Sequence, residues 1–171
     1  MIESQFWYKK VTTDIDNVVP ALNYYERVHL EGIKHTKMKG VIHKLLEDQA
    51  QLMQVYEDAH TDCSMLHKWF EEQIKVLKAR KRIEYMKDPE LKETFGELKK
   101  TDIENFVIAD ETIQSYVQIM LLLELWSESL EKLVTRISRR GIYLTMISKL
   151  RIAGEHEAYI DTTHETNPET L

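Results

Sequence analysis

Residues 123–147 read LELWSESLEKLVTRISRRGIYLTMI, and this stretch decides the fold. Two positions of a heptad repeat are apolar throughout it, apart from Arg140. The first position holds Leu123, Leu130, Ile137 and Leu144, and the second holds Trp126, Leu133, Arg140 and Ile147. This pattern is typical of long helices that pack as coiled coils. The seam crosses Gly141 without a change of phase, so we expect one helix that continues to about Arg151.

The same helix is expected to start near residue 101. Thr101-Asp-Ile-Glu104 has the form of a capping box, in which each side chain accepts a hydrogen bond from the other residue's backbone N–H. A helix of roughly 50 residues would be about 75 Å long, more than a domain of this size can cover. We therefore expect self-association through the seam residues Leu123, Trp126, Leu130, Leu133, Ile137, Leu144 and Ile147. The alternative is that the preceding helices fold back along the seam in an antiparallel bundle.

The N-terminal half predicts three shorter helices. The first follows Asp14-Ile-Asp-Asn17 and ends near Glu31, with Pro20 close to its start, where the missing N–H of proline costs nothing. The second covers about residues 38–56, where apolar residues recur at mostly helical spacing. The third is expected to start at Thr61-Asp62, a pair suited to capping, and to end before Asp88-Pro89, because proline disfavours the α conformation in the residue before it.

The composition supports an all-α fold. Only five Gly and three Pro occur in 171 residues, and 43% of the residues are hydrophobic, which favours a few long helices around one core. We expect a single helical domain over residues 1–153, built as an antiparallel hairpin or bundle. Its N-terminal helices occupy about residues 14–87, and its coiled-coil-like C-terminal helix or helices occupy residues 101–153. The acidic tail, residues 154–171, is expected to be disordered.

The sequence predicts a cytosolic protein without membrane association. Its N-terminus does not read as a signal peptide, and its longest apolar run, Ile119–Leu123, is far shorter than the roughly 20 residues that span a bilayer. The single cysteine, Cys63, leaves no partner for an internal disulfide and fits a reducing compartment.

Charge is segregated along the chain. The formal net charge of −6 at pH 7 argues by itself against a nucleic-acid partner. Basic residues nevertheless dominate residues 75–87, where Glu84 is the sole acid, and residues 132–151, which contain no acid. The excess of acids lies elsewhere, notably after Arg151. The two basic segments are therefore the candidate contacts with a polyanion.

The first basic segment suits single-stranded DNA. Its candidate contacts are Lys75, Lys78, Arg80, Lys81, Arg82 and Tyr85. All of them except Arg80 fall within roughly a third of the helix circumference, so cations that neutralise phosphates lie beside a ring on which a base can stack. The plain alternative is a solvated helix face.

The second basic segment offers Arg136, Arg139 and Arg140 as further phosphate contacts. Two alternatives stay open for these arginines. They could bind acidic partners, including this protein's own tail, or simply stabilise the negative end of the helix dipole.

No catalytic or metal centre is predicted. The pairs Glu26–His29 and Glu57–His60 have the spacing found in di-iron carboxylate proteins, but the further carboxylates of such a site are not in phase. Three residues of zinc-binding type are close in sequence, namely His60, Cys63 and His67. A fourth ligand is missing, and neither a glycine-rich phosphate loop nor a nucleophile elbow is present. We expect a binding protein that has no enzyme activity and needs no cofactor.

Three blocks of sequence occur in a recognisable order. They are Lys78-Ala-Arg80 with Tyr85 after it, Lys99-Lys-Thr-Asp-Ile-Glu-Asn-Phe-Val-Ile-Ala-Asp110, and Ile137-Ser-Arg-Arg-Gly-Ile142 followed by a last helix that ends Ala153-Gly154. Their order and approximate spacing, from about residue 75 to residue 154, resemble the UvsY family, the recombination mediators of T-even-like phages. Asp14-Ile-Asp-Asn17 resembles the family's N-terminus. Residues 18–70 are longer than the family's N-terminal part, and the acidic tail has no counterpart.

The resemblance implies a ring-like homo-oligomer that binds single-stranded DNA, contacts the phage single-stranded-DNA-binding protein and loads a RecA-like phage recombinase. Such a protein acts in homologous recombination, repair and recombination-dependent replication, in the cytoplasm of the infected bacterial host. By position, the resemblance puts Lys78 and Arg80 in the DNA site and the final helices in oligomerisation. The alternative is a helical coiled-coil interaction or virion-assembly protein without a DNA role.

Overall fold

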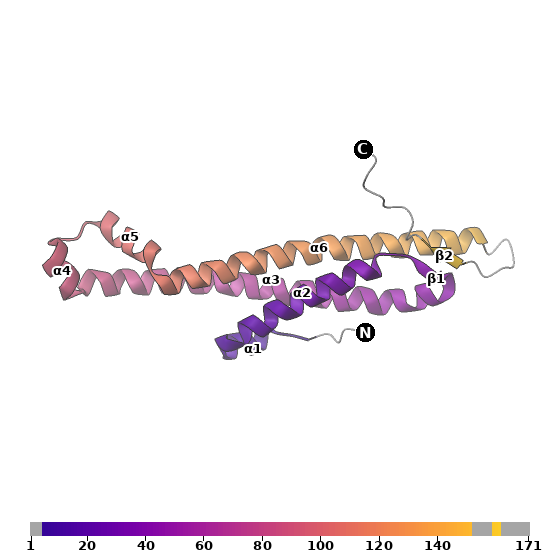
Figure 1. The fold of residues 1–171 in the computed structure, drawn as a ribbon, viewed down its shortest axis with the longest axis horizontal. Helices are drawn as coiled ribbons and strands as arrows, with labels where there is room; N and C mark the ends of the chain where they lie inside the picture. The colour runs from indigo at the N-terminus through magenta and orange to yellow at the C-terminus, as the bar shows by residue number, and fades with distance from the viewer. Residues whose placement is uncertain (1–4, 152–158, 162–171) are drawn as a thin grey trace, which may run out of the picture. The chain divides into compact units, whose positions relative to one another are not determined.

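The computed structural model describes residues 5–151 and 159–161. Its elements follow the order α1 (Tyr8–Thr13), η1 (Ile15–Asn17), α2 (Val18–His35), β1 (Lys39–Val41), α3 (Ile42–Lys87), α4 (Pro89–Phe95), α5 (Lys100–Ala109), α6 (Glu111–Arg151) and β2 (Tyr159–Asp161), as Figure 1 shows. Helices account for nearly all of the described residues, which confirms the all-α fold class.

The chain divides into two compact units. Unit 1 comprises residues 1–63 and 126–171, and unit 2 comprises residues 64–125. The helices α3 and α6 each have one part in unit 1 and another in unit 2. Continuous helix, rather than a loop, therefore joins the units at both crossing points.

The helix α3 runs without a break through Thr61 and Asp62, so the predicted helix start at this pair is wrong. The buried Asp62 carboxylate accepts hydrogen bonds from the backbone N–H groups of Trp7 and Tyr8, at 2.7 and 3.0 Å. It also accepts one from the hydroxyl of Tyr25 on α2, at 2.7 Å. An aspartate favours a helix start when its carboxylate bonds to nearby backbone N–H groups. Because Asp62 has donors elsewhere in unit 1, α3 continues.

The core of unit 1 takes apolar side chains from α1, α2, the first part of α3 and the last part of α6. The largest of those that are fully buried are Val11, Tyr25, Val28, Tyr56, Leu130, Leu133, Ile137 and Leu144. Gly32 allows α2 to approach α6 closely, because a Cβ atom there would clash with Leu133 Cδ2. A side chain at position 32 would therefore displace Leu133.

The heptad seam is packed inside the chain. Five of its members are buried, namely Leu123, Leu130, Leu133, Ile137 and Leu144. Trp126 is half-buried, with its ring centroid 5.7 Å from that of His29, and Ile147 is half-buried as well. This burial favours packing within the chain, the alternative stated above, over a seam that is open to a partner.

In unit 2, α3 ends at Lys87, which confirms the predicted end before Asp88-Pro89. Asp88 caps α4, because its carboxylate accepts hydrogen bonds from the N–H groups of Glu90 and Leu91 at 2.9 and 3.3 Å. The residues between the predicted helix end and the predicted helix start near residue 101 thus contain a short helix. Gly96 ends that helix with a φ of +74°, a conformation that favours glycine.

The helix α5 begins at Lys100, and the cap forms two residues earlier than predicted. The backbone N–H of Lys99 donates to the Asp102 carboxylate at 3.0 Å, so Asp102 takes the role that we expected for Glu104. Asp102 and Glu104 lie within one turn, and either could bond to the backbone of a cap residue. Asp102 does so because it lies three residues after the observed cap residue, Lys99.

The predicted long helix is interrupted at Asp110, where α5 and α6 meet at 60°. Asp110 accepts a hydrogen bond from the Ile113 N–H at 3.1 Å and so caps α6. The prediction of one helix from residue 101 is therefore wrong, whereas its continuity through Gly141 to Arg151 is confirmed. The core of unit 2 is built from Leu66, Phe70 and Ile74 of α3, Ile103 and Val107 of α5, and Ile113 and Leu123 of α6.

The strand β2 lies within the tail for which we expect disorder. It pairs antiparallel with β1, with Lys39 opposite Asp161 and Gly40 opposite Ile160. The rest of the tail, residues 154–158 and 162–171, lies outside the described residues. Across the part of the chain that is described, no single helix has the length and apolar character to cross a membrane, and α5 with α6 meets that test only as a bent pair.

Candidate nucleic-acid interface

The first basic segment forms the last turns of α3, in unit 2. Lys75 is exposed, but its Nζ lies 2.8 Å from Glu72 Oε1 and 3.0 Å from Glu71 Oε1. Hydrogen bonds to Glu72 and Glu71 raise the pKa of Lys75. These two acids offset its charge, so Lys75 attracts a phosphate less strongly than an unpaired lysine would.

Lys81 and Tyr85 are held within unit 2 by Asp110. The Tyr85 hydroxyl donates to Asp110 Oδ2 at 2.7 Å, and Lys81 Nζ lies 3.3 Å from the same oxygen. Lys81 also binds Glu84 at 3.1 Å. The Tyr85 ring packs near that of Phe106 on α5, with 6.0 Å between centroids. Tyr85 therefore joins α3 to α5, and this contact restricts its use as a stacking surface for a base.

Asp110 is the centre of this cluster, and only 8% of its side chain is exposed. Burial raises the pKa of Asp110, but hydrogen bonds from Tyr85, the Ile113 N–H and Lys81 together outweigh burial. Its pKa consequently lies below the ordinary value of 3.8. The hydrogen bond between Tyr85 and Asp110 also raises the pKa of Tyr85. The carboxylate form of Asp110 is thus the form that holds α3, α5 and α6 together.

We expect acid to weaken unit 2 through Asp110. Since its pKa in the folded chain is depressed, its stabilising effect is complete above the unfolded value and is lost as the pH falls through the folded value. Near neutral pH, Asp110→Asn should melt at a lower temperature than the wild type. This difference should shrink as the pH falls below about 4, because Asp110 takes up a proton first in the unfolded chain and, at a lower pH, in the folded chain as well.

Thermal melts followed by circular dichroism across acidic and neutral pH would measure this difference. Asp16→Asn is the matched control, because Asp16 is exposed in unit 1. A gap between Asp110→Asn and the wild type that stays constant with pH would show that Asp110 does not titrate as stated.

The remaining cations of the segment are Lys78, Arg80, Arg82 and Lys87. Lys78 is half-buried and the other three are exposed. Arg82 Nη2 lies 4.0 Å from Glu104 Oε1, and among residues 5–151 and 159–161 no other ion pair involves these four side chains. Lys78 and Arg82 are one turn apart, whereas Arg80 lies about 160° from Lys78 around the helix. Within this segment, these four side chains are the ones best able to bind an external anion.

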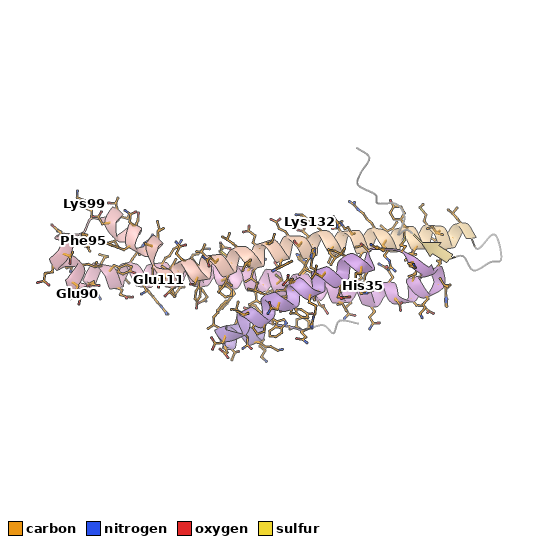
Figure 2. The ribbon with its side chains drawn as sticks, in the orientation of Figure 1. His35, Glu90, Phe95, Lys99, Glu111 and Lys132 are labelled. Atoms are coloured by element: carbon orange, nitrogen blue, oxygen red, sulfur yellow. The ribbon has the colours of Figure 1, made fainter. Side chains whose placement is uncertain are left out.

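The second basic segment lies on the part of α6 that belongs to unit 1. Lys132 projects from α6 (Figure 2) and lies 3.4 Å from Glu128. Arg136 and Arg139 are exposed, and in the described part of the chain neither forms an ion pair. Burial and the nearby charge of Arg136 lower the pKa of His29. Arg136 and Arg139 therefore remain candidate phosphate contacts.

Arg140 differs from these two neighbours because only 5% of it is exposed. Its Nη1 donates to Gln49 Oε1, and its buried Nε has no hydrogen-bond partner within the described residues. Burial lowers the pKa of Arg140, although a guanidinium remains charged at neutral pH. From the sequence we expected Arg140 to share an exposed surface with Arg136 and Arg139. Its burial shows that it does not.

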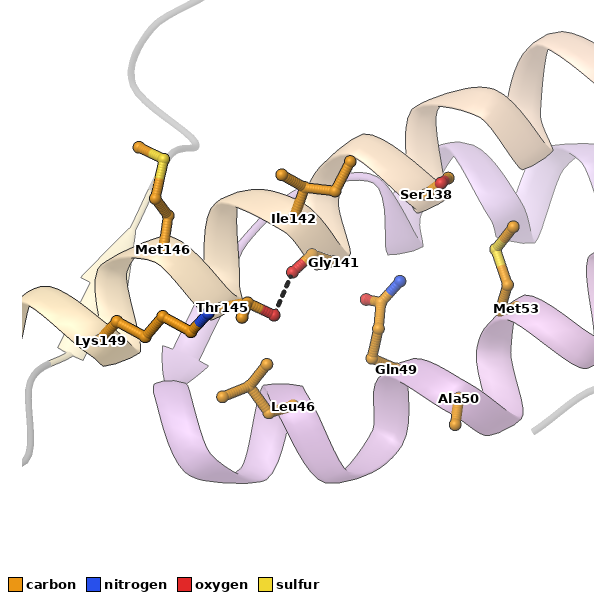
Figure 3. A pocket seen from close by; sticks show the side chains of 10 residues that line it. All are labelled: Leu46, Gln49, Ala50, Met53, Ser138, Gly141, Ile142, Thr145, Met146 and Lys149. Carbon is orange, nitrogen blue, oxygen red and sulfur yellow. Dashed lines mark hydrogen bonds between the residues drawn. The ribbon is translucent and has the colours of Figure 1, made fainter.

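Gly141 gives Gln49 the space to reach α6 (Figure 3). A Cβ at position 141 would lie 2.9 Å from Gln49 Nε2, which donates to the Ile137 carbonyl oxygen at 2.8 Å. Both residues also line an open hollow of about 620 Å³, whose other walls include Met53, Ile142 and Met146. Among the described residues, Lys149 is the one titratable residue in its lining, so these residues offer the hollow no acid–base pair for catalysis.

No family model, curated protein or solved structure matches the chain. In the described ranges, no group of three or more His, Cys, Asp or Glu side chains could hold a metal ion. Function is therefore inferred from the basic side chains and from the resemblance in sequence.

Two residues that organise these sites were not found from the sequence. Asp110 had a local signal, since it follows an apolar stripe and precedes Glu111. An aspartate followed by an acid in the first helical turn is typical of a helix cap. Gln49 had none, because its partner Ile137 lies 88 residues away.

Proposed function

We propose that this protein is a recombination mediator that binds single-stranded DNA and helps to load a RecA-like phage recombinase onto strand covered by single-stranded-DNA-binding protein. The observation that carries the proposal is the end of α3, where Lys78, Arg80, Arg82 and Lys87 have Glu104 as their sole carboxylate within 4.0 Å among described residues. Such cations displace condensed counterions from phosphates, which is the main source of sequence-independent affinity. The sequence resemblance supports the loading role.

The proposal includes a ring-like homo-oligomer whose subunits pair α3 and α6 as an antiparallel hairpin. Lys78 and Arg80 lie on different sides of α3, so neighbouring subunits would have to supply both to one strand. A ring repeats a weak site and multiplies its affinity through avidity. Self-association is supported by Ile142, Met146 and Leu150, which follow each other at one-turn spacing on α6 and are 63%, 54% and 73% exposed.

The triple variant Lys78→Ala, Arg80→Ala, Arg82→Ala tests the DNA contact. We expect it to bind a fluorescently labelled oligothymidylate more weakly than the wild type, with unchanged helicity. If each side chain neutralises one phosphate, the slope of log K against log salt should fall in magnitude by about 2, since each contact contributes about 0.7 for single strands. Fluorescence anisotropy at several salt concentrations measures both quantities.

The matched control removes the same amount of charge from exposed lysines elsewhere, with Lys9→Ala, Lys44→Ala and Lys92→Ala. It should retain the wild-type salt slope. Equal losses in the two triple variants would mean that net charge, and not the end of α3, governs binding. Unchanged affinity in the first variant would remove the DNA site from α3.

The second candidate function is a helical interaction or virion-assembly protein without a DNA role. The exposed apolar residues Ile142, Met146 and Leu150 favour it as much as they favour a ring. This candidate predicts an oligomer that does not bind oligothymidylate at either low or high salt. Native mass measurements with and without the oligonucleotide separate the two functions.

A further inference from the structure

Unit 1 contains a cationic cavity that the proposed DNA contact does not use. The cavity has a volume of about 450 Å³ and lies where the end of α2, β1 and the first turns of α3 meet Arg140 of α6. Its cationic lining is Lys34, Lys37, Lys39 and Arg140. Its apolar lining includes Leu45, Leu52 and Val55. A cavity of this size with an apolar wall and a few converging polar groups has the character of a small-molecule site.

Arg140 is a buried cation without a counterion. A guanidinium has five N–H donors, and in the described residues the only acceptor that Arg140 reaches is Gln49 Oε1. No carboxylate of the described chain forms an ion pair with it, although Asp48 acts on it from a greater distance. Burying a charge in this way is costly unless an opposite charge compensates it. An external anion would provide that compensation.

The other charges around the cavity leave it positive. Lys34 is paired with Glu31 at 2.9 Å, which neutralises one cation, and among the described residues Asp48 is the one acid that lines the cavity. His35 Nδ1 lies 2.6 Å from the Tyr56 hydroxyl. Burial lowers the pKa of His35 and raises the pKa of Tyr56 to about 12, so both are neutral near pH 7. Lys37 and Arg140 therefore exceed Asp48 in charge.

We propose that this cavity binds a small phosphate ester with a flat apolar body, as in a nucleoside monophosphate. The phosphate would lie near Arg140 and Lys37, which can donate charge-assisted hydrogen bonds to it. The base and sugar would lie against Leu45, Leu52 and Val55. The ligand has two possible sources, a free nucleotide or the terminal nucleotide of a 5′-phosphorylated strand. The proposal stands without the DNA contact of α3, because a free nucleotide is sufficient.

Isothermal titration calorimetry with AMP tests the site. We expect AMP to bind the wild type and to bind Arg140→Gln about tenfold more weakly or worse, the change expected from losing one charge-assisted contact. Lys37→Gln, at an exposed position on the rim, should weaken binding about threefold. Because Arg140→Gln removes an uncompensated charge, its ligand-free melting temperature should not fall below that of the wild type.

Lys44→Gln is the matched control, since Lys44 is an exposed lysine of α3 outside the cavity lining. Its affinity for AMP should equal that of the wild type. Comparing a 5′-phosphorylated oligothymidylate with its 5′-hydroxyl form identifies the source, because only a strand-end site distinguishes them. The proposal is overturned if AMP fails to bind at millimolar concentration, if inorganic phosphate binds as tightly as AMP, or if Arg140→Gln and Lys44→Gln bind AMP equally.

Discussion

Replacing Asp62 with alanine is expected to lower the free energy of unfolding of unit 1 by about 3–5 kcal/mol. The carboxylate accepts hydrogen bonds from the Trp7 and Tyr8 N–H groups and from the Tyr25 hydroxyl. Each donor left without an acceptor in the interior costs about 1–3 kcal/mol. The loss is large because one side chain joins three helices, α1, α2 and α3.

Urea denaturation measures the loss, and hydrogen–deuterium exchange locates it. Peptides from α1 and α2 should exchange faster in Asp62→Ala, whereas peptides from α5 should be affected least. Glu57→Ala is the control, because Glu57 is an exposed carboxylate on the same helix and its removal should cost less than about 0.5 kcal/mol. A loss in Asp62→Ala no greater than in Glu57→Ala would contradict the role assigned to Asp62.

Replacing Phe70 with alanine should destabilise unit 2 by about 3–5 kcal/mol, because it removes a fully buried ring and leaves a cavity. The Phe70 ring lies 5.0 Å from that of Trp69 and 5.5 Å from that of Tyr116, between centroids. It therefore holds α3 to the first part of α6. The variant should also alter Trp69 fluorescence in the native state.

The control for this variant is Phe95→Ala, which removes the same atoms from a ring that is 61% exposed. Urea denaturation of the two variants separates burial from composition, and we expect less than about 1 kcal/mol for Phe95→Ala. If both variants lost the same stability, the packing assigned to Phe70 would be incorrect. Loss of DNA affinity in Phe70→Ala would follow from unfolding of unit 2 and would not locate the DNA site.

Local patterns predicted the parts of the fold that depend on local physics. The end of α3 before Asp88-Pro89 follows from the steric effect of proline, and the continuity of α6 through Gly141 follows from an unbroken heptad phase. The break at Asp110 had a local signal, but the apolar stripe on both sides of it suggested one helix. An apolar period does not reveal a bend where both segments keep the same spacing.

Other features depend on contacts between residues that are far apart in sequence. In the sequence, Asp62 resembles a helix cap. Its donors, Trp7 and Tyr25, are 55 and 37 residues away, so no local pattern reveals them. The heptad seam predicts that apolar side chains are covered but does not reveal what covers them, so self-association and internal packing gave the same pattern. Arg140 belongs to that seam, and its position there was the one sign that it is buried.

The sole thiol of the chain lies where its labelling rate can report how often unit 1 opens. Cys63 follows Asp62 on α3 and is fully buried, and burial raises its pKa. Alkylating reagents need both access and the thiolate, so they can react only while unit 1 is open. The rate of labelling at Cys63 therefore measures how often the packing around Asp62 loosens, in the unmodified protein and without an engineered probe.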